Sequence, residues 1–160
     1  MASRKPRKDA KRRAAKPVFT IYTEGITEKE YFQLLASELR PCPVTFDIKV
    51  IGGDPSKVYS DLKTELTQRL RQLKREGATA NQYDRAFIVI DVDQHHKLTE
   101  TLNKCQSSPI IDAIVSNPCF ELWLLWHQFD ITRFMTTSDC VKHADSNRIT
   151  TKKHLSRNFP

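Results

Sequence analysis

The chain has 160 residues and a formal net charge of +7, and hydrophobic residues make up 39% of it. This length suits one domain with a real hydrophobic core. No apolar run reaches the roughly 18 residues that a membrane span needs, and the N-terminus lacks the apolar stretch of a signal peptide. The four cysteines show no CxxC pairing, which favours free thiols in a reducing, cytoplasmic setting over a disulfide framework.

The positive charge lies at the two ends of the chain. Residues 1–17 hold eight Lys or Arg and one Asp, residues 142–160 hold five Lys or Arg and one Asp, and the part between them is acidic. Basic arms commonly contact nucleic-acid phosphates, although a disordered solubilising tail explains the pattern about equally well. The candidates for nucleic-acid binding in the first arm are Arg4, Lys5, Arg7, Lys8, Lys11, Arg12 and Arg13.

A strand followed by a helix is predicted at the start of the folded part. Residues 18–23 are β-branched or aromatic and predict a strand that ends at Glu24 and a glycine. Thr27 and Glu30 match a capping box at the start of the helix. This box accounts for Glu30 but leaves Glu24 and Glu28 without a structural explanation. The predicted buried stripe of the helix, which runs to about residue 39, is Tyr31, Leu35 and Leu39.

Two further strands flank a long amphipathic helix. Residues 44–51 alternate between apolar and polar, and residues 85–91 form an apolar run. Asp54 as N-cap and Pro55 at the first helical position predict a helix between these strands that ends at about Glu76. Its predicted apolar stripe is Val58, Leu62, Leu66, Leu70 and Leu73.

The remaining pattern completes an α/β fold. A short helix is predicted at about 98–105 and a fourth strand at 109–115. Asn117 and Pro118 then open a helix that is apolar nearly all round, which predicts that it is buried. A last short helix is predicted at 138–143. Alternating strands and helices predict a mainly parallel, Rossmann-like sheet of four strands flanked by helices.

Two carboxylates follow the most apolar of these strands. Asp91 and Asp93 are two residues apart, so in an extended chain their side chains point to the same side. The carboxyl end of a strand is where ligands bind in open α/β sheets. Paired carboxylates repel each other unless a cation or a proton lies between them, and oxygen ligands suit Mg²⁺ or Mn²⁺. The competing interpretation is an ordinary acidic turn.

Two other side chains are candidates for the same site. His95 lies close to the two aspartates and is a candidate for proton transfer or phosphate contact, against the alternative of an exposed loop histidine. Glu121 is the exception in an apolar helix, where burial of an unpaired carboxylate costs several kcal/mol. Favourable contact with the positive end of the helix explains why a glutamate is tolerated there. A role in the site and this structural role are about equally favoured.

The order of these motifs resembles a known domain. An acidic residue and a glycine after the first strand, Asp91-x-Asp93 after the third and a βαβαβ frame resemble the Toprim domain of topoisomerases, primases and OLD-type nucleases. The match to RloB-like proteins is closer and covers roughly residues 4–130. It includes the basic arm, Gly-Asp-Pro at 53–55, Asp-x-Asp-x-His at 91–95 and Ser-Asn-Pro-x-Phe-Glu at 116–121.

This resemblance implies a role in anti-phage defence, often beside a restriction or abortive-infection ATPase, and metal-dependent phosphodiester chemistry. It implies a basic disordered arm (1–17), a Toprim-like domain (18–130) and a basic C-terminal extension (131–160), shortened because RloB-like chains usually carry more helical sequence there. The Mg²⁺ or Mn²⁺ ligands would be Glu24, Asp91 and Asp93, with Glu121 as a supporting carboxylate. Glu24 or Glu28 would act as general base or further ligand, and His95 would transfer a proton.

Two other functions are compatible with the sequence. One is a non-catalytic subunit that binds nucleic acid, with DNA the expected form, through its basic ends and docks on a partner ATPase. A titration with Mn²⁺ distinguishes this subunit from a nuclease, because only the nuclease needs the ion. The other, which is less favoured, is nucleotidyl transfer as in primases.

Overall fold

The computed structural model describes residues 16–51, 54–78, 84–92 and 97–149. Strands and helices alternate along the chain up to the last strand, as the sequence predicts. The strands are β1 (Val18–Thr23), β2 (Thr45–Val50), β3 (Arg85–Asp91) and β4 (Ile111–Ser116). The helices are α1 (Ile26–Glu38), α2 (Pro55–Arg75), α3 (Leu98–Gln106), α4 (Phe120–Trp126) and α5 (Thr137–Ser146).

The four strands form one sheet in the order β2-β1-β3-β4, and every pair is parallel. The predicted α/β, Rossmann-like class is therefore confirmed. The chain moves from β1 outward to β2 and then crosses back to β3 on the other side of β1. Such a reversal creates a crevice between the carboxyl ends of β1 and β3, where ligands bind in sheets of this kind.

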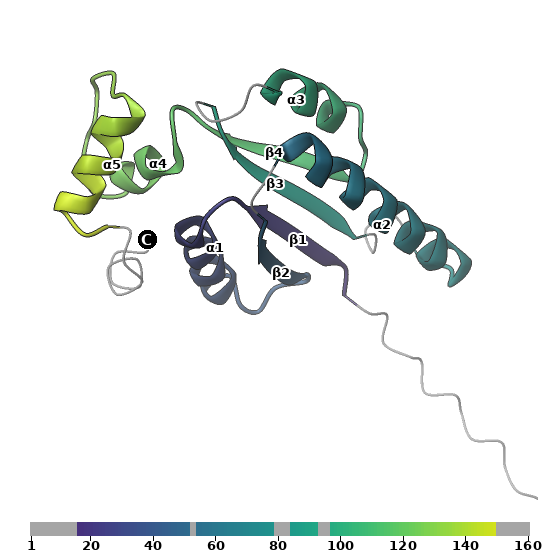
Figure 1. Ribbon diagram of the computed structural model, residues 1–160. Helices are drawn as coiled ribbons and strands as arrows, with labels where there is room; N and C mark the ends of the chain where they lie inside the picture. Colours follow the sequence, from purple (N-terminus) through teal and green to yellow (C-terminus); the bar gives the residue numbers. More distant parts are fainter. Residues whose placement is uncertain (1–15, 52–53, 79–83, 93–96, 150–160) are drawn as a thin grey trace, which may run out of the picture.

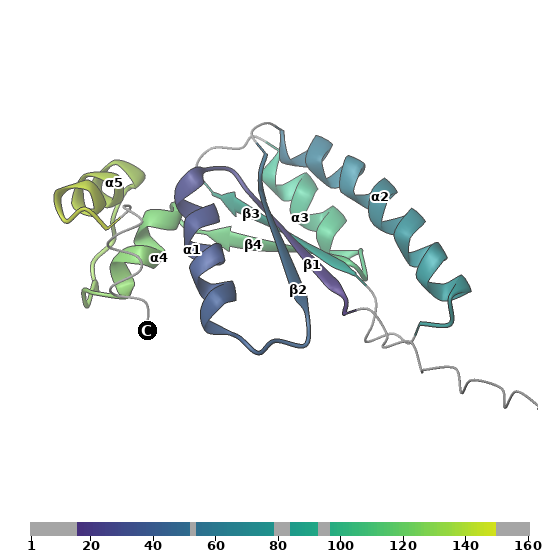
Figure 2. The same cartoon turned by 90° about the horizontal axis from the view of Figure 1, so that it is seen from below.

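Helices cover both faces of the sheet (Figures 1 and 2). On one face α2 packs beside α3, and on the other α1 packs against β1 and β2, with α4 next to it. The strands alternate between the two cores, since Ile88 and Ile90 belong to the α2/α3 core and Val89 belongs to the α1/α4 core. By the same alternation, Asp91 lies on the α1/α4 face.

The start of α2 matches its prediction. Asp54 is the N-cap, its Oδ1 atom accepts a hydrogen bond of 2.9 Å from the backbone N–H of Ser56, and Pro55 is the first helical residue. In the predicted stripe Leu62, Leu66 and Leu73 are buried, and Val58 and Leu70 pack against that core while partly buried.

The predicted burial of Leu39 is wrong because this residue lies at the margin of the fold. Leu39 follows the last residue of α1 and is 49% exposed, whereas Tyr31 and Phe32 are the buried residues of this helix. Val50 ends the edge strand β2, which has a neighbour on one side, and it is also exposed.

The helix α4 differs from its prediction in both start and burial. It begins at Phe120 with Cys119 as the N-cap, so Asn117 and Pro118 precede the helix instead of opening it. It is also not buried all round, because Trp123 and Trp126 are 44% and 52% exposed. The other side of α4 packs on α5 and on residues just outside these two helices. Together they form a third apolar cluster of Cys119, Leu122, Leu125, Met135, Cys140, Ala144 and Ile149.

The last helix, α5, extends beyond the predicted 138–143 because Thr136 and Asp139 form a capping box that starts it earlier. The four cysteines, Cys42, Cys105, Cys119 and Cys140, are free thiols. Among the described residues, no helix is both long and apolar enough to cross a membrane.

Candidate functional site

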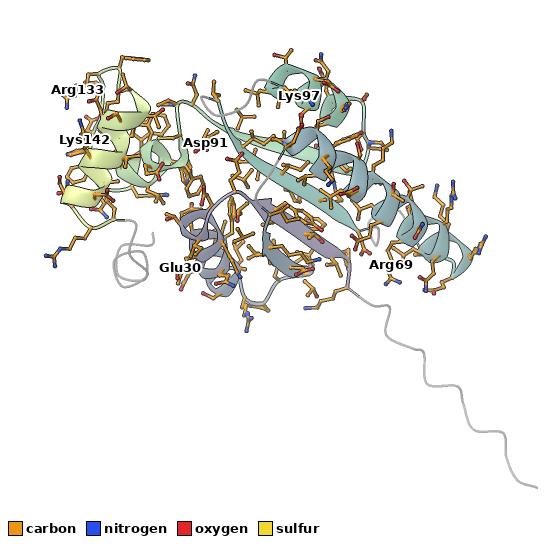
Figure 3. The ribbon with its side chains drawn as sticks, in the orientation of Figure 1. Glu30, Arg69, Asp91, Lys97, Arg133 and Lys142 are labelled. Atoms are coloured by element: carbon orange, nitrogen blue, oxygen red, sulfur yellow. The ribbon has the colours of Figure 1, made fainter. Side chains whose placement is uncertain are left out.

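Carboxylates gather at the crevice between β1 and β3. Glu24 directly follows β1, Asp91 is the last residue of β3, and these two strands are neighbours in the sheet. The charge of Glu24 acts on Asp91, as do the charges of Glu28 from α1 and Glu121 from α4. Figure 3 shows Asp91 between the end of the sheet and α4. The expected meeting of Glu24 and Asp91 at one sheet edge is present.

Asp91 is 7% exposed and has the most strongly perturbed carboxyl group of the site. Burial, and after it the negative charges of Glu24, Glu28 and Glu121, raise its pKa to about 7. A hydrogen bond from the backbone N–H of Phe120, at the start of α4, opposes this rise by stabilising the carboxylate. A buried carboxyl group whose pKa lies near 7 takes up or releases a proton easily at neutral pH.

Glu28 folds back over the turn that joins β1 to α1. Its carboxylate accepts hydrogen bonds from its own backbone N–H and from that of Gly25. A Cβ atom at position 25 would lie 2.5 Å from Oε2 of Glu28, so a glycine leaves room for this carboxylate. Burial raises the pKa of Glu28, and the charges of Glu121 and Glu24 add to that rise.

The predicted capping box of Thr27 and Glu30 is wrong. The N-cap of α1 is Gly25, so Thr27 is the second helical residue and makes no cap. Glu28, at the third helical position, bonds to the N-cap N–H as the glutamate of a capping box does. The helix starts early because the hydroxyl of the buried Thr23 donates to the Gly25 carbonyl (3.0 Å) and holds the turn tightly against β1.

Glu121 is half-buried in the first turn of α4. It faces the other carboxylates, since its charge raises the pKa values of both Asp91 and Glu28. Its carboxylate also accepts a hydrogen bond from the thiol of Cys119. Burial first, and then Glu121, raise the pKa of that thiol well above its usual range. Cys119 therefore stays protonated and acts as a donor to Glu121.

The structure brings together four of the predicted site residues: Glu24, Glu28, Asp91 and Glu121. Asp93 and His95 lie outside the described residues, as do the arginines and lysines predicted to bind nucleic acid, Arg4, Lys5, Arg7, Lys8, Lys11, Arg12 and Arg13. Across residues 16–51, 54–78, 84–92 and 97–149, no three His, Cys, Asp or Glu side chains are grouped so that they could hold a metal ion.

The chemistry of the donor set nevertheless fits a divalent cation. Carboxylate oxygens are hard ligands of the kind that Mg²⁺ and Mn²⁺ prefer. The charges of Glu24, Glu28 and Glu121 make ionisation of Asp91 less favourable, and a cation between them would reverse that effect. A ligand set completed by Asp93, two residues beyond Asp91, would therefore suit such an ion.

One feature of this region escaped the sequence prediction. Tyr31 and Phe32 of α1 and Phe120 and Trp123 of α4 line an open groove beside the carboxylates. Because the sequence of α4 is apolar nearly all round, we predicted that this helix is buried, and a buried helix would line no open groove. The spacing of Trp123 and Trp126, three residues apart, could have shown that these two indoles share one side of the helix.

The fold and the acidic crevice together define a Rossmann-like α/β protein with a candidate ligand site at the carboxyl edge of its sheet. The model of the RloB-like protein family matches residues 19–159, and the chain therefore belongs to that family. The match includes the C-terminal extension and starts after the basic arm, whereas the resemblance seen in the sequence included the arm and ended near residue 130. No curated protein and no solved structure matched the chain.

Proposed function

We propose that this RloB-like protein is a Toprim-fold nuclease of anti-phage defence that acts in the cytoplasm and depends on Mg²⁺ or Mn²⁺. The observation that carries the proposal is the buried carboxyl group of Asp91, whose pKa of about 7 reflects burial and three surrounding carboxylates. These groups come from separate elements, namely the end of β1 and the first turns of α1 and α4. Such an arrangement costs stability and is typical of a functional site.

In this proposal Asp91, Asp93 and Glu24 hold the ion, with Glu121 as a further carboxylate. When bound, the ion supplies positive charge that neutralises the scissile phosphate and acidifies a water molecule. Glu28 is suited to accept a proton, because burial already raises its pKa and its side chain is held in place by the Gly25 N–H. His95 is a second candidate for proton transfer.

The acidic crevice itself repels nucleic acid, so the substrate must be held elsewhere. We assign this role to the basic arm, residues 1–17, which carries a net charge of +7. Contacts of this kind release counterions, so binding should weaken steeply as salt rises. Deletion of the arm should abolish binding to DNA and leave the folded part intact.

Nicking of supercoiled plasmid DNA with Mn²⁺ or Mg²⁺ tests the proposal. Asp91→Asn should lower the rate at least about 100-fold, because the substitution removes a ligand and a negative charge. Glu38→Gln is the matched control, since Glu38 is exposed in the last turn of the same helix as Glu28, about 15 Å along its axis. Nicking that survives Asp91→Asn unchanged would exclude this site as its source.

A second function needs no metal ion. A non-catalytic subunit would bind nucleic acid through the basic arm, residues 1–17 with a net charge of +7, and would dock on a partner ATPase. Calorimetric titration with Mn²⁺ separates the two functions. Heat of binding that disappears in Asp91→Asn supports the nuclease, whereas no heat and no thermal shift support the subunit.

A further inference from the structure

An aromatic groove of about 460 Å³ lies between α1, the end of β4 and α4. Its walls are mostly apolar, and no charged residue is among the described residues that line it. Its volume lies in the range of pockets that hold small organic ligands. Ser116 and Asn117 contribute polar groups at one end, and the aromatic wall consists of Tyr31, Phe32, Phe120, Trp123 and Trp126.

The indole of Trp123 is held in place although it is 44% exposed. Its ring lies edge-on to Tyr31 (centroids 6.5 Å apart) and to His127 (5.0 Å). Tyr31 and His127 are themselves stacked at 5.8 Å, and the Tyr31 hydroxyl lies 3.3 Å from Nε2 of His127. Burial lowers the pKa of His127, so this ring is neutral at neutral pH. The result is a preformed, uncharged aromatic surface.

The groove is continuous with the carboxylates. Ser116, which lines it, is the register partner of Asp91 across the β3–β4 pair, so their backbones are about 5 Å apart. Phe120 lines the groove as well, and its N–H donates to the Asp91 carboxylate. Tyr31 follows Glu28 by three residues on α1, which places the two side chains on one face of that helix. A nucleotide with its phosphate at Asp91 would thus have its base next to this groove.

We propose that the groove binds an unpaired nucleobase, and that it makes the protein selective for single-stranded or locally opened nucleic acid. This inference rests on the proposed function, because it assigns the groove to the base beside the phosphate at the carboxylates. A neutral, aromatic cleft suits the face of a base, and the amide of Asn117 can both donate to and accept from a base edge. A paired base stays inside its helical stack and cannot enter.

Intrinsic fluorescence offers a direct measurement. The chain has two tryptophans, Trp123 and Trp126, and both line the groove, so the whole tryptophan signal reports on it. Full-length Asp91→Asn protein without added metal is titrated with an oligothymidylate of roughly 12 nucleotides. We expect saturable quenching by this strand, and little quenching by an abasic strand of equal length and charge or by a duplex. Equal quenching by the abasic strand would overturn the inference, since the arm alone would then explain binding.

Variants locate the contact. Trp123→Ala should weaken binding of the oligothymidylate about tenfold, with Trp126 as the remaining reporter. Trp123→Phe keeps an aromatic ring and should restore most of the affinity, which separates stacking from a general loss of folding. Phe134→Ala is the control, because Phe134 is 87% exposed and lies outside the groove. Unchanged affinity in both Trp123 variants would overturn the inference.

The outcomes also separate this inference from the nuclease proposal. Base-dependent quenching without metal-dependent nicking in the wild-type protein would retain the groove and reject the nuclease. Nicking that depends on Asp91, with quenching that ignores the base, would retain the nuclease and reject the groove. If deletion of residues 150–160 alone red-shifts the tryptophan emission, those residues cover the groove, and the base is not its occupant.

Discussion

The two faces of the sheet are built for different purposes. Among the residues that the structure describes, the α2/α3 face has a core of ten buried residues under a helix of 21 residues. The α1/α4 face has six such core residues, under helices of 13 and 7 residues, and it also carries Asp91 and the aromatic groove. The first face therefore supplies the larger core, while the second combines a smaller core with a buried carboxyl group and exposed aromatic rings.

This difference indicates how the fold tolerates an unfavourable site. A buried carboxyl group among other carboxylates destabilises the native state when it is ionised. Such a cost is acceptable only where burial elsewhere exceeds it, because the net stability of a domain is only about 5–15 kcal/mol. The regular α2/α3 face provides that burial. Stability and function should thus be separable by substitutions on opposite faces.

The largest effect is expected from a cavity in the regular core. Leu62 is 3% exposed in the α2/α3 core, so Leu62→Ala should cost about 2–5 kcal/mol in free energy of unfolding. Leu35→Ala is its counterpart on the other face, where the side chain is partly buried and borders the groove. It should cost less than half as much in urea unfolding. Equal losses would contradict the proposed division of labour between the faces.

A second substitution should act in the opposite direction. The folded pKa of Asp91, about 7, lies above its value of about 3.9 in an unfolded chain. Its proton therefore contributes stability that is complete below about pH 4 and is lost as the pH rises through 7. Asparagine does not ionise, so the Asp91→Asn protein does not lose this stability as the pH rises. The metal-free variant should be about 2–4 kcal/mol more stable than wild type at pH 8.

The measurement is urea unfolding in EDTA at pH 8 and pH 5. The advantage of Asp91→Asn should shrink on acidification, as the wild-type carboxyl group takes up its proton. Glu38→Gln, at an exposed position, should follow the wild type at both values. An Asp91→Asn protein that is less stable than wild type at pH 8 would show that the carboxylate is compensated by a partner within the protein.

Local patterns were sufficient to predict much of this architecture. The strands follow from the periodicity of apolar residues, and the cap of α2 follows from the side chain of Asp54 alone. The meeting of Glu24 with Asp91 follows from the right-handed rule for parallel connections. The wrong predictions involve choices between competing local solutions. The sequence predicted a capping box at Thr27. Instead α1 starts earlier, at the turn of Gly25, and the Glu28 carboxylate accepts a hydrogen bond from the Gly25 N–H.

Other properties depend on what packs against a helix, which composition does not reveal. The helix α4 looks uniformly apolar, yet α5 and the sheet cover only part of it and leave Trp123 and Trp126 half-exposed. Likewise, the pKa of Asp91 depends on Glu121, which is 30 positions away in the sequence. Motifs were sufficient to choose the site residues, but the effects of these residues on one another depend on the three-dimensional arrangement of the chain.

Substitutions at the N-termini of α2 and α1 test the same difference between the two faces, with smaller expected effects. Asp54 caps α2 through Ser56, and its other oxygen accepts from Lys97 at 3.0 Å between exposed side chains. Asp54→Ala should cost about 0.5–2 kcal/mol, mostly from the lost cap. Asp54→Asn retains a capping oxygen and should remain within about 0.5 kcal/mol of wild type, because exposed ion pairs contribute little. Equal costs for both variants, measured by urea unfolding, would assign the effect to the ion pair.

The smallest change in stability is expected at Gly25, where α1 starts in the site. Its φ of −124° is accessible to alanine, and the atom that a Cβ would meet is the carboxylate of Glu28, a side-chain group that can be pushed aside without moving the backbone. Gly25→Ala should therefore change the free energy of unfolding by less than about 1 kcal/mol while it displaces the Glu28 carboxylate. Since misplacement of a catalytic group by about 1 Å can lower a rate 100-fold, nicking should fall far more than stability does. Asp54→Asn, at the start of α2, is the matched control and should retain full activity. Activity that persists in Gly25→Ala would mean that Glu28 only caps its helix, because its position would then be irrelevant to the chemistry at Asp91.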